Sequence, residues 1–204
     1  SGIWQTVWLE PVAPAHIENY YVVSDIDNGT MSFEVESSAA EGDVVKVAVL
    51  EGGEGYSAET PASKVLAEAV VENGKAVVKL DKVNTWSPDA PYLYGVKVTL
   101  LRNGKVVDAV DGYTAMRKIS IVKDKTPNKY RRMALNNEPL FQFGPLDQGW
   151  WPDGLYTAPT EEALKFDIIR TKDMGFNMIR KHIKVEPARW YYWCDVYGML
   201  VWQD

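Results

Sequence analysis

The chain has 204 residues, of which 46% are hydrophobic and 25% are charged, and this composition suits one large or two modest globular domains. Its net charge of −6 is spread along the sequence, so no basic patch indicates a nucleic-acid partner. No apolar run approaches the roughly 18–20 residues that a membrane-spanning helix needs, so we expect no membrane partner either.

The first residues do not share the pattern of those that follow. The chain begins SGI, without an initiator methionine, and we interpret residues 1–12 as the last strand of an upstream domain. On this interpretation the natural N-terminus is missing, which leaves a secreted or periplasmic location open. The lone cysteine, Cys194, cannot form an internal disulfide, and we expect it in a helix core.

Residues 13–124 show the alternation of half-buried β-strands. In one example, Val45, Val47 and Val49 are separated by Lys46 and Ala48. Asn-Gly pairs, which favour the two-residue turns of β-hairpins, occur at 73–74 and 103–104. The predicted strands are 15–25, 30–37, 43–50, 63–72, 75–81, 92–102 and 105–122, the last with a break near Gly112. Antiparallel strands without helices predict an all-β immunoglobulin-like sandwich, although no Cys…Trp…Cys pattern is present.

The polar segment 123–128 (KDKTPN) predicts a domain boundary, so we assign residues 125–204 to a second domain. There, strands and helices alternate: the predicted strands are 139–143, 177–183 and 199–203, and the predicted helices are 160–173 and 187–197. Such alternation indicates parallel strands joined by helical crossovers. Because parallel sheets are covered on both faces, three strands predict the first part of a larger α/β architecture.

Four segments, in this order, resemble glycoside hydrolase family 2, the family of β-galactosidases, β-glucuronidases and β-mannosidases. They are SGIWQTVWLE at 1–10, WSPDAPYLY at 86–94, ALNNEPLFQFG at 134–144, and NMIRKHI with WYYWCDVYGMLVWQD within 177–204. The resemblance covers nearly the whole chain. It implies the end of a jelly-roll sugar-binding domain, an immunoglobulin-like domain, and a (β/α)8 TIM barrel truncated after three strands and two helices. The final VWQD leans towards mannosidase-like relatives.

The resemblance implies a retaining hydrolase of β-linked sugars, with a carbohydrate partner and with neither cofactor nor metal. Retaining hydrolysis uses two carboxyl groups about 5–5.5 Å apart, one as acid/base and one as nucleophile. In this family the two glutamates follow the fourth and seventh barrel strands, both beyond residue 204. We therefore expect no catalytic residue within the chain and no activity of the chain alone. The alternative is a non-catalytic carbohydrate-binding module or a structural interaction domain.

Site-supporting residues are implied at the ends of the second and third parallel strands. Arg180 matches the family arginine that supports the nucleophile, against the alternative of a structural ion pair. Strand alternation puts His182 on the side of Met178 and Arg180, facing the site or packed as a core histidine. Asp204 stands where relatives carry an acidic residue that closes the third strand, so it is a candidate for binding sugar hydroxyls, against the alternative of a disordered chain end. Trp202 is a candidate for stacking on a sugar ring.

The segment 147–154 (DQGWWPDG) follows the first parallel strand and combines carboxylates with aromatic rings. Asp147 and Trp151 are candidate sugar-site residues, against the alternative that the loop packs over the barrel mouth. A half-barrel also leaves an open edge and an open face, which predict association with a second copy of the chain.

Overall fold

The computed structural model describes residues 3, 5–57, 60 and 63–204. Within them the chain divides into two compact units. The β unit comprises Glu10–Trp86 and Tyr92–Pro139, and the α/β unit comprises Leu140–Asp204, Ser87–Pro91 and the described residues up to Leu9. Neither helix in these ranges is long and apolar enough for a membrane span.

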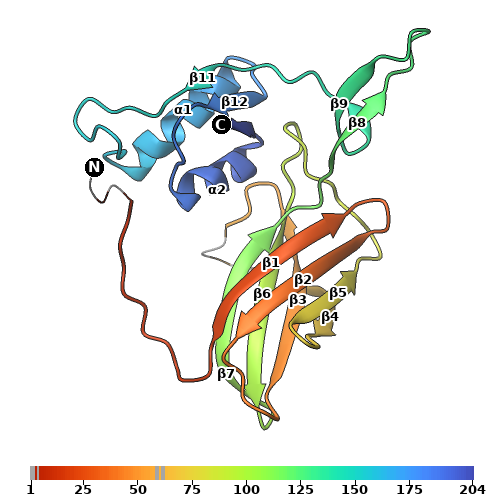
Figure 1. Ribbon diagram of the computed structural model, residues 1–204, viewed down its shortest axis with the longest axis vertical. Helices are drawn as coiled ribbons and strands as arrows, with labels where there is room; N and C mark the ends of the chain where they lie inside the picture. Colours follow the sequence, from red (N-terminus) through yellow and green to blue (C-terminus); the bar gives the residue numbers. More distant parts are fainter. Residues whose placement is uncertain (1–2, 4, 58–59, 61–62) are drawn as a thin grey trace. The chain divides into compact units, whose positions relative to one another are not determined.

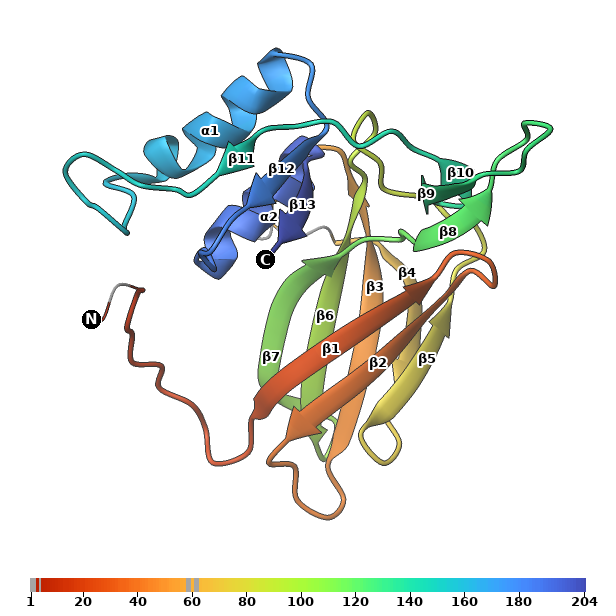
Figure 2. The ribbon, with the colours of Figure 1, turned by 45° about the horizontal axis from the view of Figure 1, so that its top comes forward.

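Two antiparallel sheets form the body of the β unit, and they face each other in Figures 1 and 2. The first has the order β1-β2-β5. Its strands are β1 (Ile17–Asp25), β2 (Thr30–Ser37) and β5 (Lys75–Lys79). The second has the order β4-β3-β6-β7. Its strands are β4 (Val65–Val70), β3 (Val44–Gly53), β6 (Leu93–Arg102) and β7 (Lys105–Thr114). The β-sandwich expected from the alternating pattern is confirmed.

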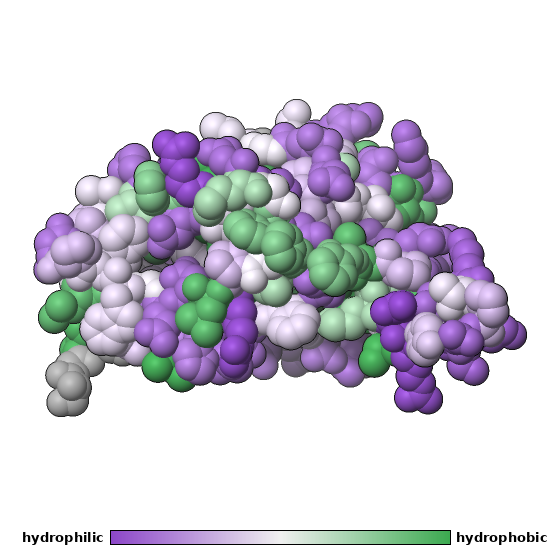
Figure 3. All heavy atoms as spheres, turned by 90° about the horizontal axis from the view of Figure 1, so that it is seen from above, coloured by the Kyte–Doolittle hydropathy of each residue, from purple (hydrophilic) through white to green (hydrophobic). Residues whose placement is uncertain are grey.

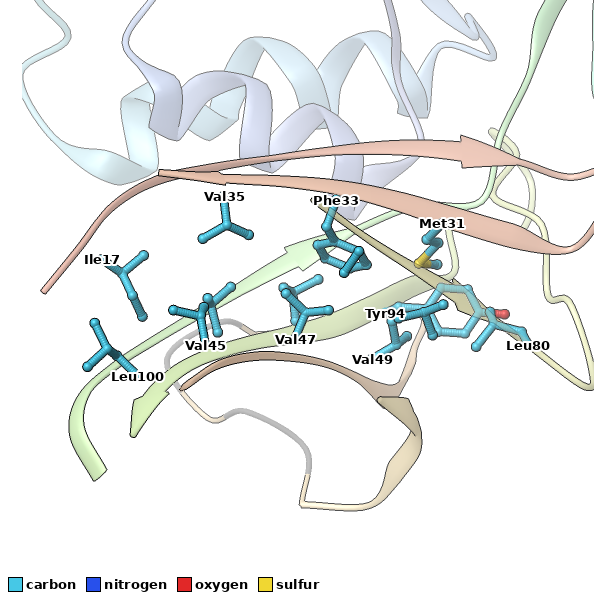
Figure 4. Close-up of a cluster of buried hydrophobic side chains, with 14 of the residues drawn as sticks. Ile17, Met31, Phe33, Val35, Val45, Val47, Val49, Leu80, Tyr94 and Leu100 are labelled. Carbon is cyan, nitrogen blue, oxygen red and sulfur yellow. The ribbon is translucent and has the colours of Figure 1, made fainter. Parts of the chain in front are cut away.

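The core of the sandwich is built from the alternating residues of both sheets. Figure 4 shows Phe33 and Val35 on one side and Val45 and Val47 on the other, pointing towards each other. Phe33 is 1% exposed and Val47 is fully buried. The residues between them in each strand point outwards, which is the period of two that the sequence displays.

The tight turns follow from the Asn-Gly pairs. Asn73 and Gly74 have φ of 52° and 76°, and Asn103 and Gly104 have 51° and 74°, so both central positions are left-handed as predicted. The predicted strand 105–122 is two strands, and its break lies at residues 115–118 instead of near Gly112.

Gly112 lies inside β7, paired with Val96 of β6. A Cβ at this position would lie 1.9 Å from the hydroxyl oxygen of Tyr20, so the glycine permits a close approach and does not end the strand.

The segment 123–128 connects two strands of a small antiparallel sheet in the order β10-β9-β8. These strands are β8 (Ile119–Lys123), β9 (Arg131–Leu135) and β10 (Glu138–Pro139). The two compact units divide after Pro139, later than the boundary expected from the sequence. Described residues from Gln5 to Val12 form no strand, and Ser1, Gly2 and Trp4 lie outside the described residues, so an upstream tail strand stays a prediction.

The α/β unit holds a parallel sheet in the order β11-β12-β13. Its elements in chain order are β11 (Leu146–Asp147), α1 (Glu161–Asp173), β12 (Met178–Lys181), α2 (Ala188–Tyr197) and β13 (Leu200–Gln203). The predicted parallel pairing and both predicted helices are confirmed. Three strands do not close a barrel, so the TIM barrel stays a prediction.

The first parallel strand lies later than predicted. Residues 139–143 do not form it, and the pairing with β12 is made by β11. A Cβ at Gly144 would lie 1.5 Å from the carbonyl oxygen of Met178, and Pro145 has no N–H to donate. Regular pairing therefore begins only after these two residues.

The helices end where the sequence indicates. The Thr160 hydroxyl accepts from the Ala163 N–H over 3.1 Å, which caps α1 at its N-terminus. Gly175, directly after this helix, has a φ of 85°. Pro187 precedes α2, and Gly198 caps its C-terminus in the left-handed conformation.

Both helices pack on one face of the parallel sheet. Their shared core consists of Ile168, Ile179, Trp190, Cys194 and Met199. Burial raises the pKa of the Cys194 thiol well above its usual value, which keeps the thiol protonated. The prediction that Cys194 packs in a hydrophobic core from a helix is thus confirmed.

Candidate functional site

The sheet face opposite the helices brings together four of the six predicted site residues. Leu146, Arg180 and Trp202 are partners in neighbouring strands, so their side chains share this face. Arg180 Nε donates to Asp204 Oδ2 over 3.1 Å, and Arg180 Nη2 donates to the same oxygen. His182 Nδ1 lies 3.3 Å from Asp204 Oδ1. These residues stand at the carboxyl ends of β12 and β13.

The Asp204 carboxylate is therefore hydrogen-bonded to two side chains, those of Arg180 and His182. The hydrogen bond from Arg180 lowers the pKa of the Asp204 carboxyl, and the hydrogen bond from His182 lowers it further. This arrangement orients Arg180 and His182. Sugar binding by Asp204 stays a prediction, and it would have to use the remaining lone pairs of this carboxylate.

Replacing Arg180 with Gln should raise the pKa of Asp204 towards its usual value, because the largest stabiliser of the carboxylate is removed. In the native chain the folded-state pKa lies below the unfolded value. The pair therefore contributes stability above the unfolded pKa, and this contribution is lost as the pH falls through the folded pKa. An NMR titration of the Asp204 side-chain carboxyl measures the shift.

The matched control is Arg170→Gln on α1, since Arg170 is also exposed and bonds a different carboxylate, Asp173, over 3.1 Å. It should leave the Asp204 titration unchanged. An identical Asp204 curve in the Arg180 variant and in the native chain would contradict the assigned pairing.

Trp202 is 43% exposed, and its indole N–H donates to Gln142 Oε1. The ring is thus held by one polar contact and remains accessible to a ligand. Other apolar side chains of the α/β unit are also exposed: Phe141, Phe143, Leu146, Trp150, Ile183 and Val185. In the space-filling view of Figure 3, hydrophobic side chains gather in a small group among hydrophilic ones. Association with a second copy stays a prediction.

The opposite face of the sheet holds Asp147, which the structure does not bring to Arg180. Asp147 pairs with Lys181 of β12 in register, and Lys181 Nζ donates to Asp147 Oδ2 over 2.5 Å. The same Nζ donates to Glu186 Oε1 over 3.0 Å and lies 4.4 Å from the centre of the Trp190 ring. Asp147 thus takes part in a partly buried ion pair on the helix side of the sheet.

Sequence reasoning missed Lys181, Lys184 and Glu186, which are 1%, 3% and 5% exposed. A signal was present: if Arg180 faces one side of β12, then Lys181 lies on the side of Ile179, which is apolar. A lysine buried there requires a carboxylate partner. Burial raises the pKa of Asp167 on α1, and the charge of Asp147 raises it further. Asp167 is thus electrostatically coupled to the charged residues around Lys181.

The loop after β11 folds upon itself. Trp151 and Leu155 exchange two backbone hydrogen bonds of 2.9 Å each, and Trp151 is half-buried. The Trp150 residue is 55% exposed, and its ring forms a T-shaped contact with the Tyr156 ring at 4.6 Å between ring centres. The loop therefore presents one open aromatic ring and one partly covered ring, and sugar contact by Trp151 stays a prediction.

No group of three or more His, Cys, Asp or Glu residues within the described ranges is arranged to hold a metal ion. What the exposed face can supply is a fixed guanidinium, an imidazole and an indole. Such groups bind and orient an anionic or hydroxyl-rich ligand.

Comparison with known proteins adds a family and a fold. The family model described as glycosyl hydrolases family 2 matches residues 15–117, which span the sandwich. A β-galactosidase of Thermoanaerobacter pseudethanolicus is 25% identical over 210 residues, covering 100% of this chain and 27% of that protein. A β-galactosidase of Streptococcus thermophilus is 27% identical over 206 residues, covering 98% of this chain and 19% of that protein.

Among solved structures, the β-glucuronidase of Ruminococcus gnavus in complex with D-glucuronic acid superposes with a TM-score of 0.75. The match covers 93% of this chain and 30% of that one at 18% identity, so it concerns the fold. The chain thus spans between about a fifth and a third of the length of these similar proteins.

Proposed function

The chain belongs to family 2 of the glycosyl hydrolases, and from this membership we propose that its residues are part of a retaining β-glycosidase. The reaction is hydrolysis of the O-glycosidic bond of a β-linked sugar. The names of the similar proteins, β-galactosidase and β-glucuronidase, support a β-glycoside as the substrate class. In this proposal the α/β unit supplies the first three strands and two helices of a (β/α)8 catalytic barrel, and the sandwich precedes it.

The observation that carries the proposal is the position of Arg180. It ends the second parallel strand on the face away from the helices, where barrel enzymes place their sites. Within the described part of the chain, its Nε and Nη2 are both bonded to Asp204, so Nη1 is available to a further carboxylate. A guanidinium held in this way can keep a glutamate nucleophile ionised and oriented.

The reaction itself needs two carboxyl groups, one to protonate the leaving oxygen and one to attack the anomeric carbon. We propose that neither belongs to these 204 residues. Asp147 is engaged by Lys181 on the helix side of the sheet, away from Arg180. The hydrogen bond from Arg180 lowers the pKa of Asp204, which makes this carboxyl unsuited to protonating a leaving group. The chain's part in catalysis is to position the nucleophile and to bind the sugar.

The 204-residue chain by itself should show no hydrolysis of p-nitrophenyl β-galactoside, β-glucuronide or β-mannoside. Enzymes lower such barriers by about 8–23 kcal/mol, and without the carboxyl pair this chain has no group for either chemical step. The measurement is nitrophenolate release at high protein concentration. Turnover that purifies with the chain and disappears in an Asp204→Asn variant would contradict the proposal.

The positive test uses the coding sequence that continues past Asp204. It should supply a glutamate after the next strand, and the longer protein should hydrolyse one of the three glycosides. In that protein Arg180→Gln should lower kcat by about 10²-fold or more, as for other single groups that stabilise the transition state. Arg170→Gln, its control, should leave kcat unchanged. A stop codon directly after Asp204 would favour a non-catalytic module.

A further inference from the structure

Four charged side chains lie beneath the loop that follows β11. Lys181 joins Asp147 to Glu186, and Lys184 Nζ lies 3.1 Å from the same Glu186 oxygen, Oε1. Lys184 Nζ also donates to the backbone carbonyl of Gly149 over 2.7 Å and lies 5.0 Å from the centre of the Tyr156 ring. Lys181, Lys184 and Glu186 are almost fully buried. Charged groups are rarely buried this fully unless they are paired, so this network has a defined geometry.

The network forms hydrogen bonds with the backbone of the loop at Gly149, in the tight bend that we call the Gly149 turn. The Gly149 N–H donates to Asp147 Oδ1 over 2.7 Å, while the Gly149 carbonyl accepts from Lys184. Gly149 has a φ of 64°, and a Cβ there would lie 2.2 Å from Glu186 Oε1 and 3.0 Å from Lys184 Nζ. Only glycine allows the turn and the ions to approach this closely.

The segment that carries Lys184 is itself strained. Ile183 has a φ of 51°, which is an outlier for a β-branched residue. Its side chain is 62% exposed, so burial of Ile183 does not offset this strain. The buried contacts come from the residues that follow the bend, Lys184 and Glu186. Strained backbone of this kind persists where the surrounding contacts over-determine it, often at functional sites.

We propose that Lys184 is a positioning residue that, with Lys181 and Glu186, holds the Gly149 turn and thereby sets where Trp150 and Trp151 meet a β-glycoside. The sugar in this statement rests on the proposed function, whereas the positioning of the turn does not. Trp150 and Trp151 follow Gly149 directly, so a displaced turn moves both rings. The tryptophans are the ligand contacts in this proposal, and Lys184 acts through them.

The test of positioning is amide hydrogen exchange in the full chain without a ligand. The reporters are the N–H groups of Gly149, Trp151 and Leu155, each of which donates a hydrogen bond within the loop. In Lys184→Met, exchange at these amides should rise about tenfold or more, because the loop loses its buried charge-assisted contact. Amides of β12, β13 and α2 should keep their native rates.

Two further variants keep the test decisive. The paired variant K184M/E186Q removes one positive and one negative charge, so it avoids leaving a buried charge uncompensated and should fold if K184M does not. The control is Lys172→Met, since Lys172 Nζ also donates to two backbone carbonyls, those of Pro88 and Gly198, away from the loop. It should leave loop exchange unchanged. Native loop rates in both Lys184 variants, or an equal rise in the control, would overturn the proposal.

A second measurement concerns the sugar. Titration with methyl β-galactopyranoside and methyl β-glucuronide, followed by tryptophan fluorescence, should give a Kd about tenfold higher in Lys184→Met than in the native chain and in Lys172→Met. Equal Kd values in all three would overturn the link between the turn and the sugar. No fluorescence change in the native chain with either glycoside would contradict sugar contact by this loop, while the exchange rates would still decide the positioning role.

Discussion

Replacement of Lys181 with Met should lower the free energy of unfolding of the α/β unit by about 3–5 kcal/mol, because it removes the buried cation that Asp147 and Glu186 share. Lys181 is 1% exposed, and its ammonium lies between Asp147 and Glu186 at 2.5 and 3.0 Å. Lys184 still pairs with Glu186, and the Asp147 side chain keeps 18% of its surface in water. We therefore expect the lower end of this range.

Urea unfolding followed by tryptophan emission measures this change. The control is Lys165→Met on α1, whose ammonium lies 4.4 Å from the centre of the Trp193 ring and should contribute less than about 1 kcal/mol. Adding Asp147→Asn to the Lys181 variant should recover part of the loss, since it neutralises the carboxylate that Lys181→Met leaves without a cation. An unchanged unfolding midpoint in Lys181→Met would show that the buried cluster contributes nothing to stability.

Replacement of Phe33 with Ala should destabilise the sandwich by about 3–5 kcal/mol, the usual cost of removing a buried phenyl ring and leaving a cavity. Phe33 is 1% exposed and lies between the two sheets among Val45, Val47 and Tyr94 in the same core cluster (Figure 4). Each sheet contributes only one layer to this core, so neighbouring side chains cannot close the cavity without shifting a whole strand.

The matched control is Tyr21→Ala on the adjacent strand β1, since Tyr21 is also aromatic but is 64% exposed. Its loss should change the free energy of unfolding by less than about 1 kcal/mol. Chemical denaturation followed by far-ultraviolet circular dichroism compares the two variants. Equal midpoints for Phe33→Ala and Tyr21→Ala would contradict the assignment of Phe33 to the centre of the core.

Local patterns were sufficient for much of the fold. The alternation around Val45, Val47 and Val49 predicted β3 within a few residues, and Asn73-Gly74 and Asn103-Gly104 predicted their turns. Local signals also predicted the helices: Thr160 marks the N-terminus of α1, and Gly198 marks the C-terminus of α2. These signals act between residues close in the chain, because side-chain period and backbone φ are local properties.

Two failures of prediction involve contacts between distant residues. The first parallel strand was expected at 139–143 because that segment is apolar, yet the close approach of Gly144 to Met178 moves regular pairing to Leu146–Asp147. The break in the last sandwich strand was expected at Gly112. This glycine instead lies inside β7, where its missing side chain makes room for the Tyr20 hydroxyl of another strand. Neither contact leaves a trace in the local sequence.

For the site, the sequence by itself predicted that Arg180 and His182 lie on the same side of the second parallel strand, because side chains alternate along a strand. The tertiary structure decided that both side chains contact Asp204. Only the tertiary structure decided that Asp147 lies on the other face, bound to Lys181, and that Lys184 holds the Gly149 turn. The reason is physical. Which carboxylate neutralises a buried lysine depends on distances between β11, β12 and the segment that follows β12. Once the fold buries the lysine, it must pair with a carboxylate that the fold places beside it.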